Sequence, residues 1–372
     1  MMKTIVVSAV NLNVGGTLTI LRDCLSFLSE FSVKKNYRVV AIVYKKELAN
    51  FPNIEYIEDQ WPKKRWVNRL WYEYVSMKKI SKELAPVDLW LSLHDTTPNV
   101  LAEKQAVYCH NPFPFYEWKW RECLFAPKIV LLSLFSKFIY KKNINKNTFV
   151  IVQQQWLKDE FKKLFKLKSD KIIVALPDSP KNEDMNVNIK KDTDSVYEFI
   201  YAASPNSHKN FECLCHAAKI LENDGINNFK VNITLSGNEN KYAIWLYKRY
   251  GKIVKSIQWI GFQNRKSLFQ QYEKCDCLVF PSKVETWGLP ISEFSEFNKP
   301  MLLADLSYAQ ETAAGSQRVA FFNPNDPKEL AGQMKLLIQG DTSSLNIIPK
   351  KVIVEPVTHS WKELFQTLLF EA

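Results

Sequence analysis

Two glutamates, Glu285 and Glu293, flank a stretch whose residue types suit the binding of a phosphorylated sugar. The apolar run 277–280 predicts a strand before them, and Pro290 predicts the first turn of a helix. Backbone N–H groups between strand and helix lie at the positive end of the helix dipole, which favours an anion such as a diphosphate. They belong to Thr286, Trp287, Gly288 and Leu289. Carboxylates accept hydrogen bonds from sugar hydroxyls, so the pattern predicts a nucleotide-sugar site.

A lysine in an earlier connection suits the same ligand. Lys209 lies in the segment 204–210, between a predicted strand at 197–202 and a predicted helix at 210–223. There it can balance the negative charge that develops on a departing diphosphate. A solvated loop lysine is the alternative, and His208 is expected to be only its neighbour.

An adjacent glycine pair, Gly15 and Gly16, ends the turn-rich loop that follows a predicted strand at 4–10. Small residues let backbone approach a ligand closely. A tight turn would also need them. The chain has only 10 glycines, however, so an adjacent pair is less expected by chance, which favours a functional role.

The composition is that of a globular protein. The chain has 372 residues, 46% hydrophobic and 24% charged, which suits two domains. It shows no N-terminal signal pattern and no apolar run of the roughly 20 residues that span a bilayer, so we expect a cytoplasmic location. Seven cysteines without a disulfide or zinc pattern indicate reduced thiols.

The net charge of +11 is uneven, because residues 1–186 carry +10 of it and residues 187–372 carry +1. Basic and aromatic residues alternate over 61–82 and again over 135–146. Such mixtures suit an anionic membrane surface, and they also suit nucleic acid. Solvated lysines over an aromatic core are the plainer explanation.

Apolar runs alternate with helix-like segments along the whole chain, which predicts an α/β fold of two doubly wound domains. The first is expected over 1–177. A polar linker with Pro and Asn follows at 178–196, and a second series of strands and helices fills 197–356. An amphipathic helix at 357–372 is expected to pack near the N-terminal domain.

With these motifs the chain resembles retaining glycosyltransferases of family 4, which have the GT-B fold, two Rossmann-like domains that face each other across a cleft. The family signature is a pair of glutamates separated by seven residues, as in Glu285 and Glu293. The resemblance implies that Glu285 contacts the donor sugar, that Glu293 holds the nucleotide ribose, and that Lys209 and the Gly15-Gly16 pair face its phosphates. It also implies that His110 reaches the donor sugar. His94-Asp95 is a weaker acceptor-side candidate.

The resemblance further implies a hexosyltransferase that moves a sugar from a nucleoside-diphosphate donor to a hydroxyl of an undecaprenyl-diphosphate-linked glycan. It would serve O-antigen (lipopolysaccharide) or other surface-polysaccharide synthesis, peripheral to the inner membrane through its basic first domain. No nucleic-acid partner is expected. No metal is expected either, since the one Asp-x-Asp pair, Asp192 and Asp194, lies in the predicted linker.

One departure from the family pattern is that Ser204 stands where an arginine is usual, and Lys283 or Arg265 are the possible replacements. A basic nucleic-acid-binding protein, a sugar-nucleotide epimerase of the same fold and a non-catalytic partner subunit remain alternatives. The donor sugar, its base, the acceptor linkage and the oligomeric state stay open.

Overall fold

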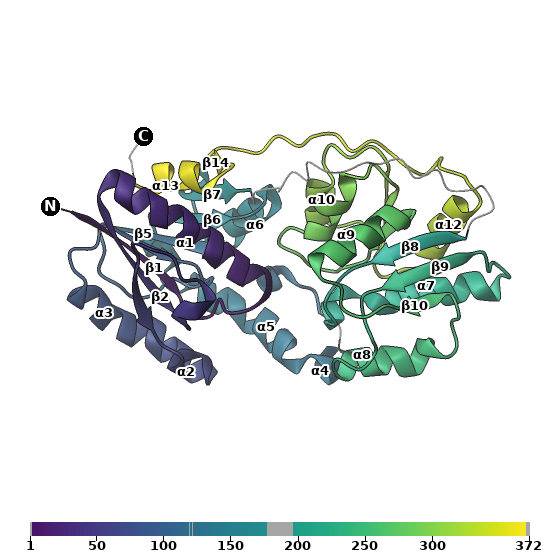
Figure 1. Ribbon diagram of the computed structural model, residues 1–372, viewed down its shortest axis with the longest axis horizontal. Coiled ribbons are helices and arrows are strands. Elements are labelled where there is room, and N and C mark those ends of the chain that lie inside the picture. Colours follow the sequence, from purple (N-terminus) through teal and green to yellow (C-terminus); the bar gives the residue numbers. More distant parts are fainter. Residues whose placement is uncertain (1, 119, 121, 177–195, 370–372) are drawn as a thin grey trace. The chain divides into compact units, whose positions relative to one another are not determined.

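The computed structural model describes residues 2–118, 120, 122–176 and 196–369 (Figure 1). The chain divides into two compact units. The first, unit 1, comprises Met1–Pro114, Phe135–Asp178 and Ile353–Ala372. The second, unit 2, comprises Phe115–Leu134 and Ser179–Val352. The linker expected at 178–196 lies, apart from Val196, outside the described residues.

Unit 1 is built on an eight-stranded sheet whose paired strands all run parallel. Its order is β14-β7-β6-β5-β4-β1-β2-β3. The strands are β1 (Lys3–Ala9), β2 (Tyr37–Val43), β3 (Glu55–Glu58), β4 (Leu89–Ser92), β5 (Lys104–Cys109), β6 (Phe149–Val152), β7 (Ile172–Ala175) and β14 (Val357–Thr358).

Both faces of this sheet are covered, as the near-continuous apolar strands predict. Along β1, Ile5 and Val7 belong to one hydrophobic core and Val6 to another, because successive side chains point to opposite faces. The first core includes residues of helices α1 (Gly15–Lys35) and α13 (Trp361–Leu369). The second includes Tyr72, which follows α2 (Trp66–Trp71), and Met77, the first residue of α3 (Met77–Glu83). Helix α6 (Gln155–Phe165) contacts β6 and β7.

Unit 2 repeats the design with a six-stranded parallel sheet in the order β10-β9-β8-β11-β12-β13. The strands are β8 (Tyr197–Tyr201), β9 (Phe229–Ile233), β10 (Ile257–Trp259), β11 (Cys277–Phe280), β12 (Met301–Ala304) and β13 (Val319–Phe322). The helices are α7 (Phe211–Asn223), α8 (Lys241–Leu246), α9 (Arg265–Lys274), α10 (Leu289–Ser295), α11 (Ser307–Thr312) and α12 (Pro327–Ile338).

One segment of the first half of the chain belongs to unit 2. Phe115–Leu134 contains helix α4 (Glu122–Phe125) and the first half of α5 (Pro127–Lys141). The Phe125 ring lies 5.0 Å from that of Trp245 and 5.9 Å from that of Tyr242 on α8. The segment therefore groups with unit 2, whereas the sequence predicted it within the first domain, 1–177.

The two parallel sheets establish the predicted α/β architecture, and Ile353–Ala372 joins unit 1. The glycine pair corrects one expectation. Gly15 and Gly16 do not end a loop but open helix α1. Among the residues that the structure describes, no helix is long and apolar enough to cross a membrane.

Candidate functional site

Each sheet has a point where the chain reverses the direction in which it adds strands, and ligands of doubly wound folds bind at the carboxyl ends of such strands. In unit 1, β1 pairs with both β2 and β4. In unit 2, β8 pairs with both β9 and β11. The predicted site residues follow these strands. Lys209 lies in the connection after β8, and Glu285 lies in the connection after β11.

In unit 2 the structure brings Lys209 and Glu285 into contact. Lys209 Nζ donates to Glu285 Oε1, and the two side chains are only 16% and 15% exposed. The lysine closes the short 3-10 turn Ser207–Lys209, and its carbonyl accepts from the hydroxyl of Tyr201 at 2.7 Å. A partly buried ion pair at the carboxyl edge of a parallel sheet therefore joins two of the predicted catalytic residues.

Residues that the sequence did not single out hold the two connections together. Asn210, in the left-handed conformation with φ 58°, donates from its amide to the carbonyls of Pro281 and Pro324. The hydroxyl of Ser282 donates to the carbonyl of His208 at 3.4 Å. Tyr308 donates to the carbonyl of Ser282 at 2.6 Å. Because these partners lie far apart in sequence, no local signal could have identified them.

The loop after Glu285 leads directly into helix α10, which was expected near Pro290 and begins at Leu289. Gly288 precedes it with φ 88°, and a Cβ there would lie 3.2 Å from the side chain of Ile291. Only glycine adopts this backbone without strain. The indole N–H of Trp287 donates to Ser292, and its carbonyl accepts from Thr312. The Thr286–Leu289 backbone is thus fixed at the start of a helix.

Glu293 lies on α10, eight residues beyond Glu285 in the chain, with a side chain that is 20% exposed. Burial raises its pKa, an effect that Arg265 opposes and Glu296 reinforces. The guanidinium of Arg265, 59% exposed, lies 3.9 Å from Glu293 Oε1. A partly desolvated carboxylate with one loose ionic partner can accept hydrogen bonds from a polar ligand.

A second lysine lies near the first. The backbone N–H of Lys283 donates to the carbonyl of His208 at 2.8 Å. Its ammonium group, 11% exposed, lies 3.4 Å from Glu122 and 4.0 Å from Glu212. Burial lowers the pKa of His208 to about 3, with Lys209 and Lys283 acting in the same direction. Two lysines therefore flank an imidazole that is neutral at pH 7.

In unit 1 the glycine pair starts helix α1, which follows β1 after the loop 10–14. Gly15 has φ 62°, a conformation that favours glycine, and a Cβ on either glycine would meet no described atom within 4 Å. Thr17 donates to the carbonyl of Val14 at 3.0 Å and so closes the first turn. Gly15 and Gly16 therefore lie beside open space, and their role in binding a ligand stays a prediction.

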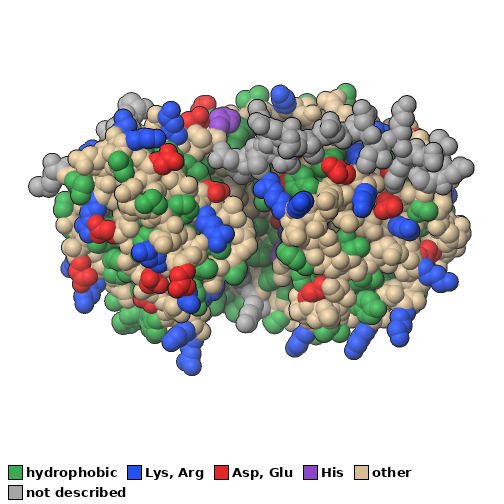
Figure 2. All heavy atoms as spheres, viewed as in Figure 1, with side chains coloured by type: hydrophobic (Ala, Val, Ile, Leu, Met, Phe, Trp, Pro, Cys, Tyr) green, Lys and Arg blue, Asp and Glu red, His purple; other side chains and the backbone are tan. Residues whose placement is uncertain are grey.

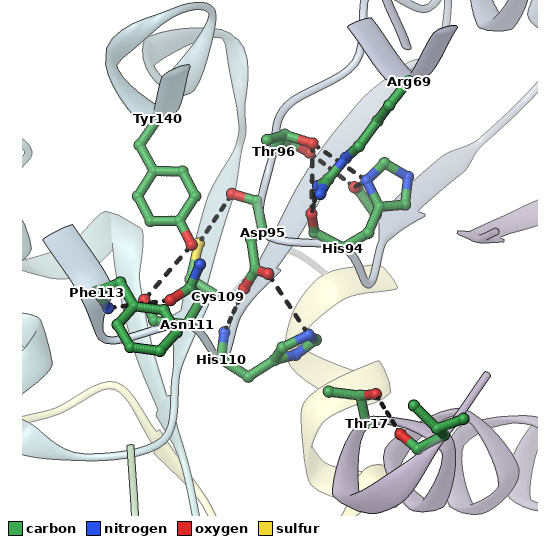
Figure 3. Close-up of polar contacts among 12 residues, drawn as sticks. Thr17, Arg69, His94, Asp95, Thr96, Cys109, His110, Asn111, Phe113 and Tyr140 are labelled. Atoms are coloured by element: carbon green, nitrogen blue, oxygen red, sulfur yellow. Dashed lines mark hydrogen bonds and ion pairs between the residues drawn. The ribbon is translucent and has the colours of Figure 1, made fainter. Parts of the chain in front are cut away.

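His110 follows β5 and turns toward Asp95, which follows β4 (Figure 3). Asp95 Oδ1 accepts from the His110 backbone N–H at 2.8 Å, and Asp95 Oδ2 lies 3.7 Å from His110 Nε2. Asp95 was only a weak candidate from the sequence. Its contact with His110 brings two of the predicted residues of unit 1 together.

A buried charged network lies beside this pair. Glu73 is 0% exposed and contacts Arg69 Nε at 2.8 Å and His94 Nδ1 at 3.3 Å. Its second oxygen accepts from Thr96 at 2.7 Å. Burial alone would raise the pKa of Glu73, but Arg69 and His94 outweigh it and lower the pKa to about 2. Arg69 also donates to the carbonyl of His94, so the network orders the loop that leads into Asp95.

In the part of the chain that the structure describes, no cluster of three or more His, Cys, Asp or Glu side chains could hold a metal ion. Asp192 and Asp194 lie outside the described residues.

Comparison with known proteins identifies the region around the Lys209–Glu285 pair. Residues 180–351 match the family model described as glycosyl transferases group 1. The matched stretch is similar to a group 1 glycosyltransferase domain. This stretch contains Lys209, Glu285 and Glu293, and it corresponds to most of unit 2.

Further similarities extend over most of the chain. The O-antigen chain mannosyltransferase RfbU of Salmonella typhimurium is 22% identical over 273 residues, which cover 72% of this chain and 70% of RfbU. The lipopolysaccharide outer core galactosyltransferase WaaB superposes with a TM-score of 0.63 at 12% identity, over 92% of this chain and 91% of WaaB. Anabaena HepE in complex with UDP-glucose gives a TM-score of 0.56 at 14% identity, over 92% of each chain. Such structural likeness establishes the GT-B fold.

Proposed function

We propose that the protein is a retaining glycosyltransferase of family 4. It moves a hexose from a nucleoside-diphosphate sugar to a hydroxyl of a lipid-linked glycan, in O-antigen or other surface-polysaccharide synthesis. The observation that carries the proposal is the Lys209–Glu285 pair, which lies within the group 1 domain where two parallel strands end. The relatives that act on O-antigen and on the lipopolysaccharide core support the choice of pathway.

In this proposal unit 2 binds the donor. Lys209 neutralises the departing diphosphate, Glu285 accepts hydrogen bonds from the donor sugar and Glu293 holds the ribose. Thr286 to Leu289 supply backbone N–H groups to the phosphates. Catalysis then rests on positioning and on electrostatic stabilisation of the leaving group, and the leaving phosphate helps to deprotonate the acceptor hydroxyl.

Lys283 supplies the cation that Ser204 cannot. It shares the surroundings of His208 with Lys209, whereas Arg265 lies against Glu293, the proposed ribose ligand. With two lysines in place, no divalent metal is required. Transfer activity that survives EDTA supports this part of the proposal, and activity restored only by added Mg²⁺ or Mn²⁺ contradicts it.

Unit 1 takes the acceptor and reaches the inner-membrane surface, where an undecaprenyl-diphosphate-linked glycan lies. Exposed aromatic residues on and before α2 support this: Trp61 is 41% exposed, Trp66 47% and Trp71 59%. Exposed Lys64 and Arg65 flank them. On the face drawn in Figure 2, basic, acidic and hydrophobic side chains are intermixed, an arrangement that does not resemble a nucleic-acid-binding groove.

Thermal-shift measurements with UDP, GDP and dTDP test the donor assignment. A ligand at 100 times its dissociation constant stabilises the folded protein by about 2.7 kcal/mol, so the matching nucleotide stands out. The matching nucleotide sugar is then incubated with the protein, with and without membrane extract. Incorporation of sugar into lipid supports transfer. Isomerisation or hydrolysis of the donor without acceptor indicates an epimerase instead, and stabilisation by none of the nucleotides overturns the proposal.

A further inference from the structure

The two ring nitrogens of His110 have unlike surroundings (Figure 3). The side chain is 6% exposed, and Nε2 faces the carboxylate of Asp95 at 3.7 Å. Nδ1 is buried and has no hydrogen-bond partner among the described residues. A buried polar atom without a partner costs free energy, so a native site that keeps one calls for an explanation. One explanation is a ligand that donates a hydrogen bond to Nδ1.

Asp95 is held beside the imidazole by an uncommon backbone conformation. Its φ is 70°, in the left-handed region that a non-glycine residue adopts only at a cost in free energy. Its N–H donates to the carbonyl of Tyr108 at 3.3 Å, and its carbonyl accepts from the thiol of Cys109 at 3.7 Å. Strained residues persist where the surroundings over-determine them, and they cluster at functional sites.

The carboxylate decides which nitrogen carries the proton. A neutral imidazole has one N–H donor and one lone-pair acceptor, and the proton favours the nitrogen that faces a negative charge. Burial lowers the pKa of His110, and His94 and Arg69 act in the same direction against Asp95. The neighbouring ring of Tyr108 lies 5.8 Å away. His110 is therefore neutral at pH 7, with its proton on Nε2 and its lone pair on Nδ1.

We propose that Asp95 is a positioning residue that fixes His110 in the Nε2–H form, so that the buried Nδ1 accepts a hydrogen bond from a sugar hydroxyl. The inference rests on the proposed sugar transfer and adds a chemical requirement to it. An acceptor nitrogen pairs with a hydroxyl and not with a phosphate or carbonyl oxygen, which are acceptors themselves. In this proposal His110 binds the sugar, and other groups bind the diphosphate.

Asp95→Asn separates this role from a merely structural one. The Asn carbonyl oxygen can still accept from the His110 backbone N–H, as Asp95 Oδ1 does at 2.8 Å. Its amide, however, donates toward Nε2, which moves the ring proton to Nδ1 and turns that atom from acceptor into donor. The variant keeps the shape of the site and reverses the polarity of the nitrogen that meets the sugar.

The first measurement is the tautomer itself, by two-bond ¹H–¹⁵N correlation on ¹⁵N-histidine-labelled protein. His110→Gln identifies the signals of His110 among the five histidines. We expect the Nε2–H form in the wild type and the Nδ1–H form in Asp95→Asn. An Nδ1–H form in the wild type overturns the inference, whatever the result of any transfer assay.

The second measurement is activity. We expect Asp95→Asn to lower kcat/KM by about 10- to 100-fold, as for a lost buried hydrogen bond, with an unchanged melting temperature. Wild-type activity falls below the pKa of His110, because the imidazolium donates from both nitrogens, and the variant lacks this acidic limb. Full activity of Asp95→Asn overturns the inference. Failure of the wild type to transfer sugar from every donor tried overturns the proposed function instead, and the tautomer measurement still decides the role of Asp95.

Discussion

Lys209 and Glu285 form an ion pair although 76 positions separate them in the chain. The pair joins the connection after β8 to the connection after β11, two strands that are direct neighbours in the sheet. A cation and a carboxylate in contact can exchange partners when a ligand brings both phosphate and hydroxyl groups. The arrangement therefore suits one molecule that carries both, as a nucleotide sugar does.

Loss of the Lys209 charge should cost activity more than stability. We expect Lys209→Ala to lower kcat by about 10²- to 10³-fold, the usual effect of removing one stabilising group from a developing negative charge. Lys209→Arg should recover part of the rate. Lys230→Ala, at an exposed position of β9, is the control. Steady-state kinetics with the matching donor measure the effect, and a fully active Lys209→Ala protein would show that another group stabilises the diphosphate.

Lys283 is predicted to act with Lys209. Because Glu122 is 4% exposed, removal of Lys283 alone would leave a buried carboxylate without its cationic partner. The variant to measure is therefore Lys283→Ala combined with Glu122→Gln. We expect it to fold and to lose kcat by at least about tenfold. Glu122→Gln alone is the control and should keep its rate. A double variant as fast as the control would exclude Lys283 from the site.

Glu293 should contribute to nucleotide binding at the expense of stability. Its raised pKa means that the folded state binds the proton more tightly than the unfolded state, so ionisation costs stability as pH rises above the usual glutamate range. We expect Glu293→Gln to weaken binding of the matching nucleoside diphosphate by about tenfold. Its melting temperature should equal or exceed that of the wild type at pH 7, with no gain at pH 4. Isothermal titration and differential scanning calorimetry test these expectations, and unchanged affinity would contradict the ribose assignment.

Glu73 should contribute to stability in a pH-dependent way. A pKa of about 2 in the folded state, against the usual 4.5, corresponds to about 3 kcal/mol. This stability is present above the unfolded pKa and is lost as pH falls toward 2. We expect Glu73→Gln to lose about that amount at pH 7 and the difference to vanish near pH 2. The control, Glu83→Gln, removes an exposed partner of Lys79 and should change little. Denaturant titrations across pH measure both, and a constant difference would exclude the ionised network.

Membrane association should depend on the residues around α2. Each exposed cation contributes about 1 kcal/mol at an anionic surface, so Lys64→Gln with Arg65→Gln should reduce liposome partitioning roughly 30-fold. Lys63 is left unchanged because it contacts Asn13 and the Tyr44 ring. Lys34→Gln with Lys35→Gln, at the exposed end of α1, removes the same charge elsewhere. Sedimentation with anionic vesicles compares them, and equal loss in both variants would argue against a defined membrane-facing surface.

Local patterns sufficed for most of the regular elements. The strand Cys277–Phe280 has the predicted bounds, and the strand Tyr197–Tyr201 differs from its prediction by one residue, because short buried runs carry a strong apolar signal. The edge strand Glu55–Glu58 was not predicted, since half of its residues are charged. Depletion of apolar residues is common at a sheet edge, which faces solvent on one side.

The candidate site was predictable only residue by residue. Lys209 and Glu285 each stood out by type and position, but their contact depends on β8 and β11 becoming neighbours across 76 positions. The importance of Asp95 depends on a left-handed backbone that no periodicity reports. The ring contact between Phe125 and Trp245 could not be predicted from the sequence, because aromatic packing of this kind follows from tertiary structure alone.

The placement of Phe115–Leu134 has a consequence for synthesis and for dissection of the protein. The chain enters unit 2 at Phe115, leaves it after Leu134, enters it again at Ser179 and leaves it after Val352. During translation the ribosome releases Phe125 long before Trp245, so this piece waits for its partner while unit 1 begins to fold. Neither half of the gene encodes a complete folding unit. A split of the coding sequence near residue 178 should therefore yield two fragments that are soluble only when they are produced together.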